Sequence, residues 1–206
     1  TTTGASNTAV GAGSLSTNTT ADNNTAVGYL SLYANTTGEA GVAVGKSALA
    51  ANTTGNYNVS VGVLALEDNT TGSNNVAMGL SALANNTTAS NNTALGFEAL
   101  KVNTTGSENT AVGRLSLDAN TTGTNNTAMG NQALGANTTA NYNTAIGENA
   151  LAANTTGANN VAVGAFALDG NTTVSETTAV GYGTLGAANT GIRNQAFGTE
   201  AMLSNT

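Results

Sequence analysis

The chain contains no cysteine, proline, histidine or tryptophan, and charged residues make up only 7% of it. Without cysteine, no disulfide can staple the fold. Without histidine or cysteine, the commonest metal ligands, general bases and thiol nucleophiles are missing. We therefore expect no catalytic residue, no metal site and no cofactor, and we predict that the protein is not an enzyme.

Basic residues are also scarce. Four Lys and Arg stand against eleven Asp and Glu, which gives a net charge of −7. So few positive charges cannot neutralise a run of phosphates, and they give little attraction to an anionic membrane surface. The chain also lacks the apolar run of about 20 residues that a membrane span needs. We expect neither nucleic-acid binding nor membrane insertion.

The sequence is dominated by one repeat. A glycine recurs every 17 residues without insertion, and the unit reads roughly N-T-A-V-G-x-x-A-L-x-x-N-T-T-G-x-x. A disordered polar chain has no reason to keep such a register. We predict a single repeat domain over residues 1–206, with about twelve coils and no visible caps. The repeated glycines are Gly11, Gly28, Gly45, Gly62, Gly79, Gly96, Gly113, Gly130, Gly147, Gly164, Gly181 and Gly198.

Other side chains keep fixed positions relative to this glycine. An apolar residue precedes it, a small residue follows at the third position and Leu or Met at the fourth. The two large apolar residues are expected to serve the interior of each coil, contributing about 3–6 kcal/mol when buried. Asn fills the seventh position except at Ala188, and Thr fills the ninth from Thr20 through Thr190. Charges and tyrosines use only six of the seventeen positions, which are expected to face water.

This pattern favours an all-β fold. Gly and Asn-Thr clusters would break a helix in every unit. An antiparallel meander is disfavoured, because Asn-Gly, a preferred hairpin turn, never occurs. We predict a parallel β-solenoid, or β-roll, with strands around "NTAVG" and "ALxx". Stacked Asn would form amide ladders and Thr columns hydroxyl ladders. The small Ala before the apolar residue would lie in the coil interior or against a partner chain.

Several segments also resemble known repeats. "NTAVGYLSL", "NTALGFEAL" and "NTAIGENAL" resemble head repeats of trimeric autotransporter adhesins. They are more similar still to Asn/Thr-rich arrays of phage tail fibre and bacterial cell-surface proteins. The resemblance implies a left-handed β-roll, a homotrimer and an extracellular fibre. The unit here is longer than the adhesin head repeat.

The recurrent Asn-Thr-Thr could mark N-glycosylation, but a turn with an Asn ladder is the favoured interpretation, since glycans one coil apart would collide. "NTTGTNN" lacks the helix and lysine of a phosphate-binding loop, and the scattered acids do not predict a calcium site. The Asn-Thr-Thr asparagines are Asn18, Asn35, Asn52, Asn69, Asn86, Asn103, Asn120, Asn137, Asn154 and Asn171.

We predict a structural shaft of an extracellular, cell-surface or virion fibre. Its expected partner is itself, as a homotrimer or as copies stacked end to end. The alternative is a ligand-binding face, for ice along the Thr columns or for a host glycan or receptor along the aromatics. Those aromatics are Tyr29, Tyr33, Tyr57, Phe97, Tyr142, Phe166 and Tyr182.

Overall fold

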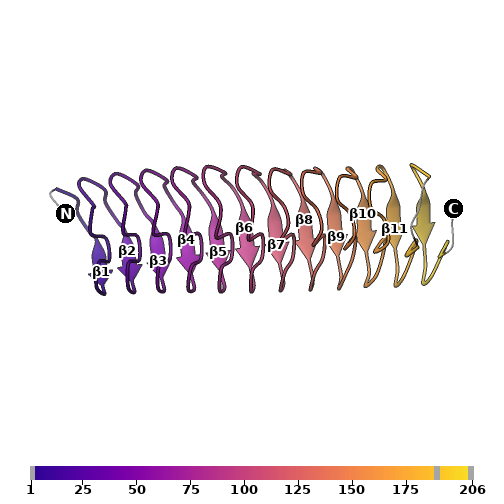
Figure 1. Cartoon of the computed structure of the whole chain (residues 1–206), viewed down its shortest axis with the longest axis horizontal. Coiled ribbons are helices and arrows are strands. Elements are labelled where there is room, and N and C mark those ends of the chain that lie inside the picture. Colours follow the sequence, from indigo (N-terminus) through magenta and orange to yellow (C-terminus); the bar gives the residue numbers. More distant parts are fainter. Residues whose placement is uncertain (1–2, 188–190, 204–206) are drawn as a thin grey trace.

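The computed structural model describes residues 3–187 and 191–203, and within them it forms a parallel β-solenoid without helices (Figure 1). Each repeat contributes one three-residue strand, and the strands form one sheet in sequence order. Ala188 and Thr190 lie outside the described residues. The strands are β1 (Thr8–Val10), β2 (Thr25–Val27), β3 (Val42–Val44), β4 (Val59–Val61), β5 (Val76–Met78), β6 (Thr93–Leu95), β7 (Thr110–Val112), β8 (Thr127–Met129), β9 (Thr144–Ile146), β10 (Val161–Val163), β11 (Thr178–Val180) and β12 (Gln195–Phe197).

Successive coils stack in register. In the pairing of β6 with β7, Ala94 lies opposite Ala111, its equivalent in the next repeat. The turns are bonded in the same way, since the amide of Leu100 donates to the carbonyl of Ser116 at 2.9 Å. The fold class predicted from the repeat is therefore confirmed, and the antiparallel meander is excluded.

The prediction of a second strand around "ALxx" is wrong. Those residues form turns, and the leucines at the fourth position after the repeated glycine have positive φ, for example 52° at Leu100 and 52° at Leu117. A left-handed backbone at a bulky residue costs about 1–2 kcal/mol. Burial of the leucine side chain, worth about 1.5–3 kcal/mol, offsets that cost.

The core of each coil is narrow. It consists of the middle strand residue, the small residue after the glycine and the leucine, as in Ala94, Ala99 and Leu100, all fully buried. The small Ala column thus faces the interior of its own coil. The expectation of a second large buried residue is wrong: Met78 and Met129 are more than 40% exposed. Side chains alternate across a strand, so a buried middle residue sends both neighbours outward.

An amide ladder runs through the interior, as predicted. From Asn18 to Asn137, each Asn-Thr-Thr asparagine accepts, on its Oδ1, a hydrogen bond from the Nδ2 of the next, at 2.8–3.3 Å. The threonine after each Asn behaves differently from the expected hydroxyl ladder. Its hydroxyl donates to the backbone carbonyl of the next threonine, as from Thr87 to Thr104 at 3.1 Å.

A second asparagine column, whose bonding the repeat unit did not predict, precedes the strands. The amide of Asn92 donates to Oδ1 of Asn75 at 3.0 Å, and Nδ2 of Asn92 donates to the carbonyl of Gly106 at 3.0 Å. Asn75 and Asn92 are fully buried. These hydrogen bonds join the asparagine directly before each strand to both neighbouring coils.

The repeated glycine is required by the backbone. Gly96 has φ of 138°, a region that is almost closed to other residues. A Cβ there would lie 2.5 Å from the carbonyl oxygen of Gly113 in the next coil. The glycine therefore permits both the sharp turn after the strand and the close stacking of coils.

Candidate functional surface: the outer sheet face

The first and third residues of strands β1–β12 form one continuous surface, called here the outer sheet face. In every strand the first residue is Thr, Val or Gln and the third is Val, Met, Leu, Ile or Phe, so the described face carries no charge. The third residues are the more open, with Met78 at 44% and Ile146 at 38% exposure. Large apolar residues aligned along a parallel sheet are unusual when nothing covers them, because parallel sheets are usually buried on both faces.

The Asn-Thr-Thr asparagines are not available as glycan acceptors in the folded chain. All ten are buried, with exposures between 0% and 3%. The second threonine of the motif is the exposed one: Thr37, Thr88 and Thr173 belong to this outward-facing column. The structure thus leaves one regular, solvent-facing threonine column at this corner of the coil.

Charges and aromatics lie at three other corners, as their positions in the unit predict. Lys101 pairs with Glu98 at 2.7 Å, and Arg193 with Glu176 at 2.5 Å. The hydrogen bond to Glu176 raises the pKa of Arg193. Within the described part of the chain, no three potential metal-ligating side chains come together.

The aromatics singled out from the sequence do not gather into one site. Six of the seven are exposed, and Phe166 is half-buried against Tyr182, with ring centroids 5.8 Å apart in an edge-to-face arrangement. The guanidinium carbon of Arg114 lies 5.9 Å from the centroid of Phe97. Tyr29 and Tyr33 share one coil. Apart from these two and the Phe166–Tyr182 pair, the aromatics lie on separate coils rather than on a common platform.

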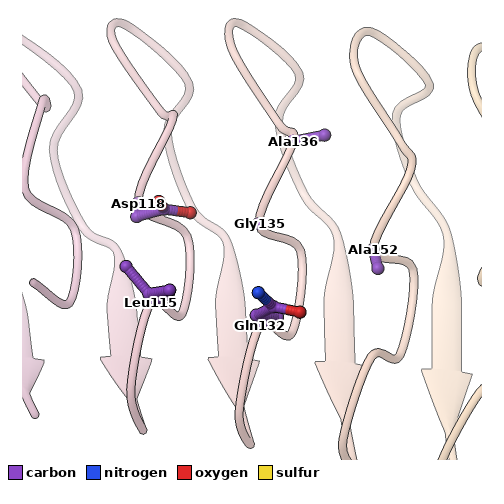
Figure 2. Close-up of a pocket in the computed structure, with 6 residues that line it drawn as sticks. All are labelled: Leu115, Asp118, Gln132, Gly135, Ala136 and Ala152. Atoms are coloured by element: carbon purple, nitrogen blue, oxygen red, sulfur yellow. The ribbon is translucent and has the colours of Figure 1, made fainter. Parts of the chain in front are cut away.

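Two indentations interrupt the side of the coil, and both follow a glycine at the fifth position after the repeated glycine. The first encloses about 290 Å³ next to Gly135. Figure 2 shows Leu115 and Asp118 on one turn, Gln132 and Gly135 on the next and Ala152 on a third. The second encloses about 430 Å³ next to Gly186. The repeat unit alone did not indicate these hollows, because each arises where one coil lacks a side chain that most of the others carry.

The carboxylates beside the indentations are partly desolvated. Burial raises the pKa of Asp118, and hydrogen bonds from backbone amides at Asp118 and Ala119 oppose it. Burial likewise raises the pKa of Asp169. Burial, together with the charge of neighbouring Asp68, raises the pKa of Glu67.

The fold and surface define a class: a parallel β-solenoid repeat protein with a buried asparagine ladder and an uncharged outer sheet face. Comparison of the chain with protein-family models, curated proteins and solved structures gives no match. The relation to fibre and adhesin repeats therefore stays a prediction that rests on the repeat motif. Within residues 3–187 and 191–203 there is no helix with the length and apolar character to cross a membrane.

Proposed function

We propose that the chain is a rigid spacer in an extracellular or virion fibre, a shaft that holds another part of the assembly at a distance. The observation that carries this proposal is the unbroken register of β1–β12, in which each coil pairs with the next through the same positions. Each strand begins 17 residues after the one before it, so no insertion separates one strand from the next.

The bonding of the coils supports stiffness. Bending the rod would separate coils on one side, which would lengthen backbone bonds, Asn–Asn bonds and Thr hydroxyl bonds together. In the middle of the rod, for example, Asn103 is bonded to Asn86 at 3.0 Å and Thr104 to the carbonyl of Thr121 at 3.1 Å. The eleven steps between twelve strands, at about 4.8 Å each, give a rod of roughly 53 Å.

The outer sheet face is the proposed contact between copies of the chain, and the proposed assembly is a homotrimer with these faces turned inward. An uncharged face with aligned apolar residues would pack against its own equivalent without desolvating a charge. Charges on the other corners would stay in water. The length of the face matches the length of the rod, so association would support every coil.

The association has a direct test. Sedimentation or light scattering should give three chains per particle for the wild type. Met78→Lys with Met129→Lys places two charges on the outer sheet face and should yield monomers that keep a β-type circular dichroism spectrum. Tyr57→Lys with Tyr142→Lys changes two residues that are each 60% exposed at another corner, and it should leave the trimer intact. A monomeric wild type, or equal behaviour of the two variants, would reject this interface.

The shaft itself is tested by electron microscopy of the particle. We expect straight rods of uniform length, on the order of 53 Å for this segment. Bent or variable particles would argue against a spacer role.

A second candidate function is favoured by the exposed threonine column. Thr37, Thr88 and Thr173 stand on equivalent coils of a regular array, which is a suitable geometry for ice. Thermal hysteresis in cooled solution would support ice binding by this column.

Binding of a host glycan by the exposed aromatics is a separate alternative, which a glycan array would test.

A further inference from the structure

The larger indentation has a specific structural cause. In the coil that follows β11, both the second and the fifth residues after Gly181 are glycines, Gly183 and Gly186. Side chains from the coils before and after therefore stand around an empty position. Phe166 and Asp169 contribute from the coil of β10, Tyr182 from that of β11 and Glu200 from that of β12. The hollow of about 430 Å³ falls in the size range of small-ligand sites.

The floor of this hollow is backbone. Gly183 is buried, and a Cβ added to it would meet only Cγ of Glu200, at 3.5 Å. A Cβ on Gly186 would lie 3.1 Å from Oδ1 of Asp169. The Asp169 carboxylate therefore lies next to Gly186. The Phe166 and Tyr182 rings also line the hollow, with their centroids 5.8 Å apart in an edge-to-face arrangement.

The lining has a clear chemical bias. It combines two aromatic rings and two carboxylates with no Lys or Arg. Aromatic faces attract cations, and carboxylates accept hydrogen bonds from them. A sugar would need donors as well as acceptors, and Tyr182 has the only hydroxyl among the lining side chains. Two carboxylates also fall short of the oxygen ligands that a bound calcium requires.

We propose that this hollow binds a guanidinium group. A guanidinium is planar, stacks on aromatic rings and presents several N–H donors in a fork that matches carboxylates. An ammonium is a more strongly hydrated point charge, so the rings would contribute less to its binding. The guanidinium can come from an arginine side chain of a partner protein or from a free guanidino compound. This site is independent of the proposed shaft and of the outer sheet face.

Calorimetric titration of the full chain tests the proposal. Methylguanidinium and N-acetyl-arginine amide should both bind with one site per chain and a Kd in the millimolar range or tighter, about −4 kcal/mol or more favourable. N-acetyl-citrulline amide, which has nearly the same shape without the charge, should bind at least about tenfold more weakly. Tighter binding of the arginine amide than of methylguanidinium would identify a peptide as the source, and equal binding would show that the guanidinium is sufficient.

Two variants locate the site. Gly183→Leu fills the hollow with a residue that the same position of other coils carries at similar φ: Leu30 has 55°, Leu115 has 53° and Gly183 has 59°. This variant should keep its fold and lose binding at least about tenfold, as should Asp169→Asn, which removes a charge-assisted hydrogen bond to the guanidinium. Tyr57→Ala, at a distant corner, should bind as the wild type does. Unchanged affinity in Gly183→Leu, a citrulline amide that binds equally well, or a preference for glucose over methylguanidinium would overturn the proposal.

Discussion

At the residue scale, the fold depends on buried asparagines as well as on buried leucines. Asn103 donates to Oδ1 of Asn86 at 3.0 Å and to the carbonyl of Gly106 at 2.9 Å, and it accepts from Asn120 at 2.9 Å. The side chains of Asn86, Asn103 and Asn120 are all fully buried. A buried amide that satisfies three partners is strongly specified, because a substitute leaves each partner unpaired.

Asn103→Asp should therefore destabilise the rod severely. The carboxylate cannot donate to Asn86 or Gly106, and it places an unpaired charge among buried acceptors, which costs about 3 kcal/mol or more. Thermal unfolding followed by circular dichroism at pH 7 measures the loss. Asn85→Asp makes the same chemical change at an exposed position of the preceding coil and should shift the midpoint little. Similar losses from both variants would contradict the ladder.

At the element scale, a three-residue strand has no stability of its own and exists only because two neighbours hold it. Each coil therefore contributes mainly through its contacts with the next. The leucine carries most of the apolar burial. The half-buried Glu98–Lys101 pair, with side chains 26% and 38% exposed, is worth about 0–1 kcal/mol.

Leu100→Asp should melt the coils around β6 and β7 first. Replacing the buried leucine with a charged side chain removes its burial and desolvates a carboxylate, so a loss of about 4 kcal/mol or more is expected. Glu98→Gln should change stability by less than about 1 kcal/mol. Hydrogen exchange resolved by segment is the measurement: amides near β6 and β7 should lose protection while those near β2 keep more of it. Equal protection in the two variants would reject the assignment of the core.

The sequence predicted these elements unevenly. The 17-residue register was enough to predict the solenoid and the Asn-Thr-Thr ladder, because only stacked coils keep whole columns. It did not reveal the left-handed backbone at Leu100, since bulky residues disfavour that region. The register also led to the wrong prediction that the apolar residues before the glycine, such as Met129, lie in the interior. In a coil this narrow, Ala128 fills the inner side of the strand and leaves no room for a second large side chain.

At the scale of the whole molecule, three acids make the free energy of unfolding depend on pH in the same direction. Burial raises the pKa of Glu67, Asp118 and Asp169. The folded chain therefore binds these protons more tightly than the unfolded chain does. The resulting stabilisation is complete below the ordinary values of 4.5 for Glu and 3.8 for Asp, and it is lost as pH rises through the raised values.

Acidification from pH 7 towards pH 4 should thus raise the free energy of unfolding, as measured by denaturant titration. Asp118→Asn combined with Asp169→Asn should flatten much of this dependence, because both titrating groups are gone while the side-chain acceptors remain. A wild type that loses stability steeply over the same range would contradict the assigned direction of these pKa shifts.

The chain advances by one inter-strand spacing in every 17 residues. The absence of cysteine permits clean spin labelling at Thr37, Thr88 and Thr173, which face solvent on equivalent coils. Thr37 and Thr173 are eight repeats apart, and Thr88 and Thr173 five, so double electron–electron resonance should give narrow distances near 38 Å and 24 Å at about 4.8 Å per repeat. Distances about twice as long, as two strands per repeat in a zigzag would produce, or broad distributions would contradict the account.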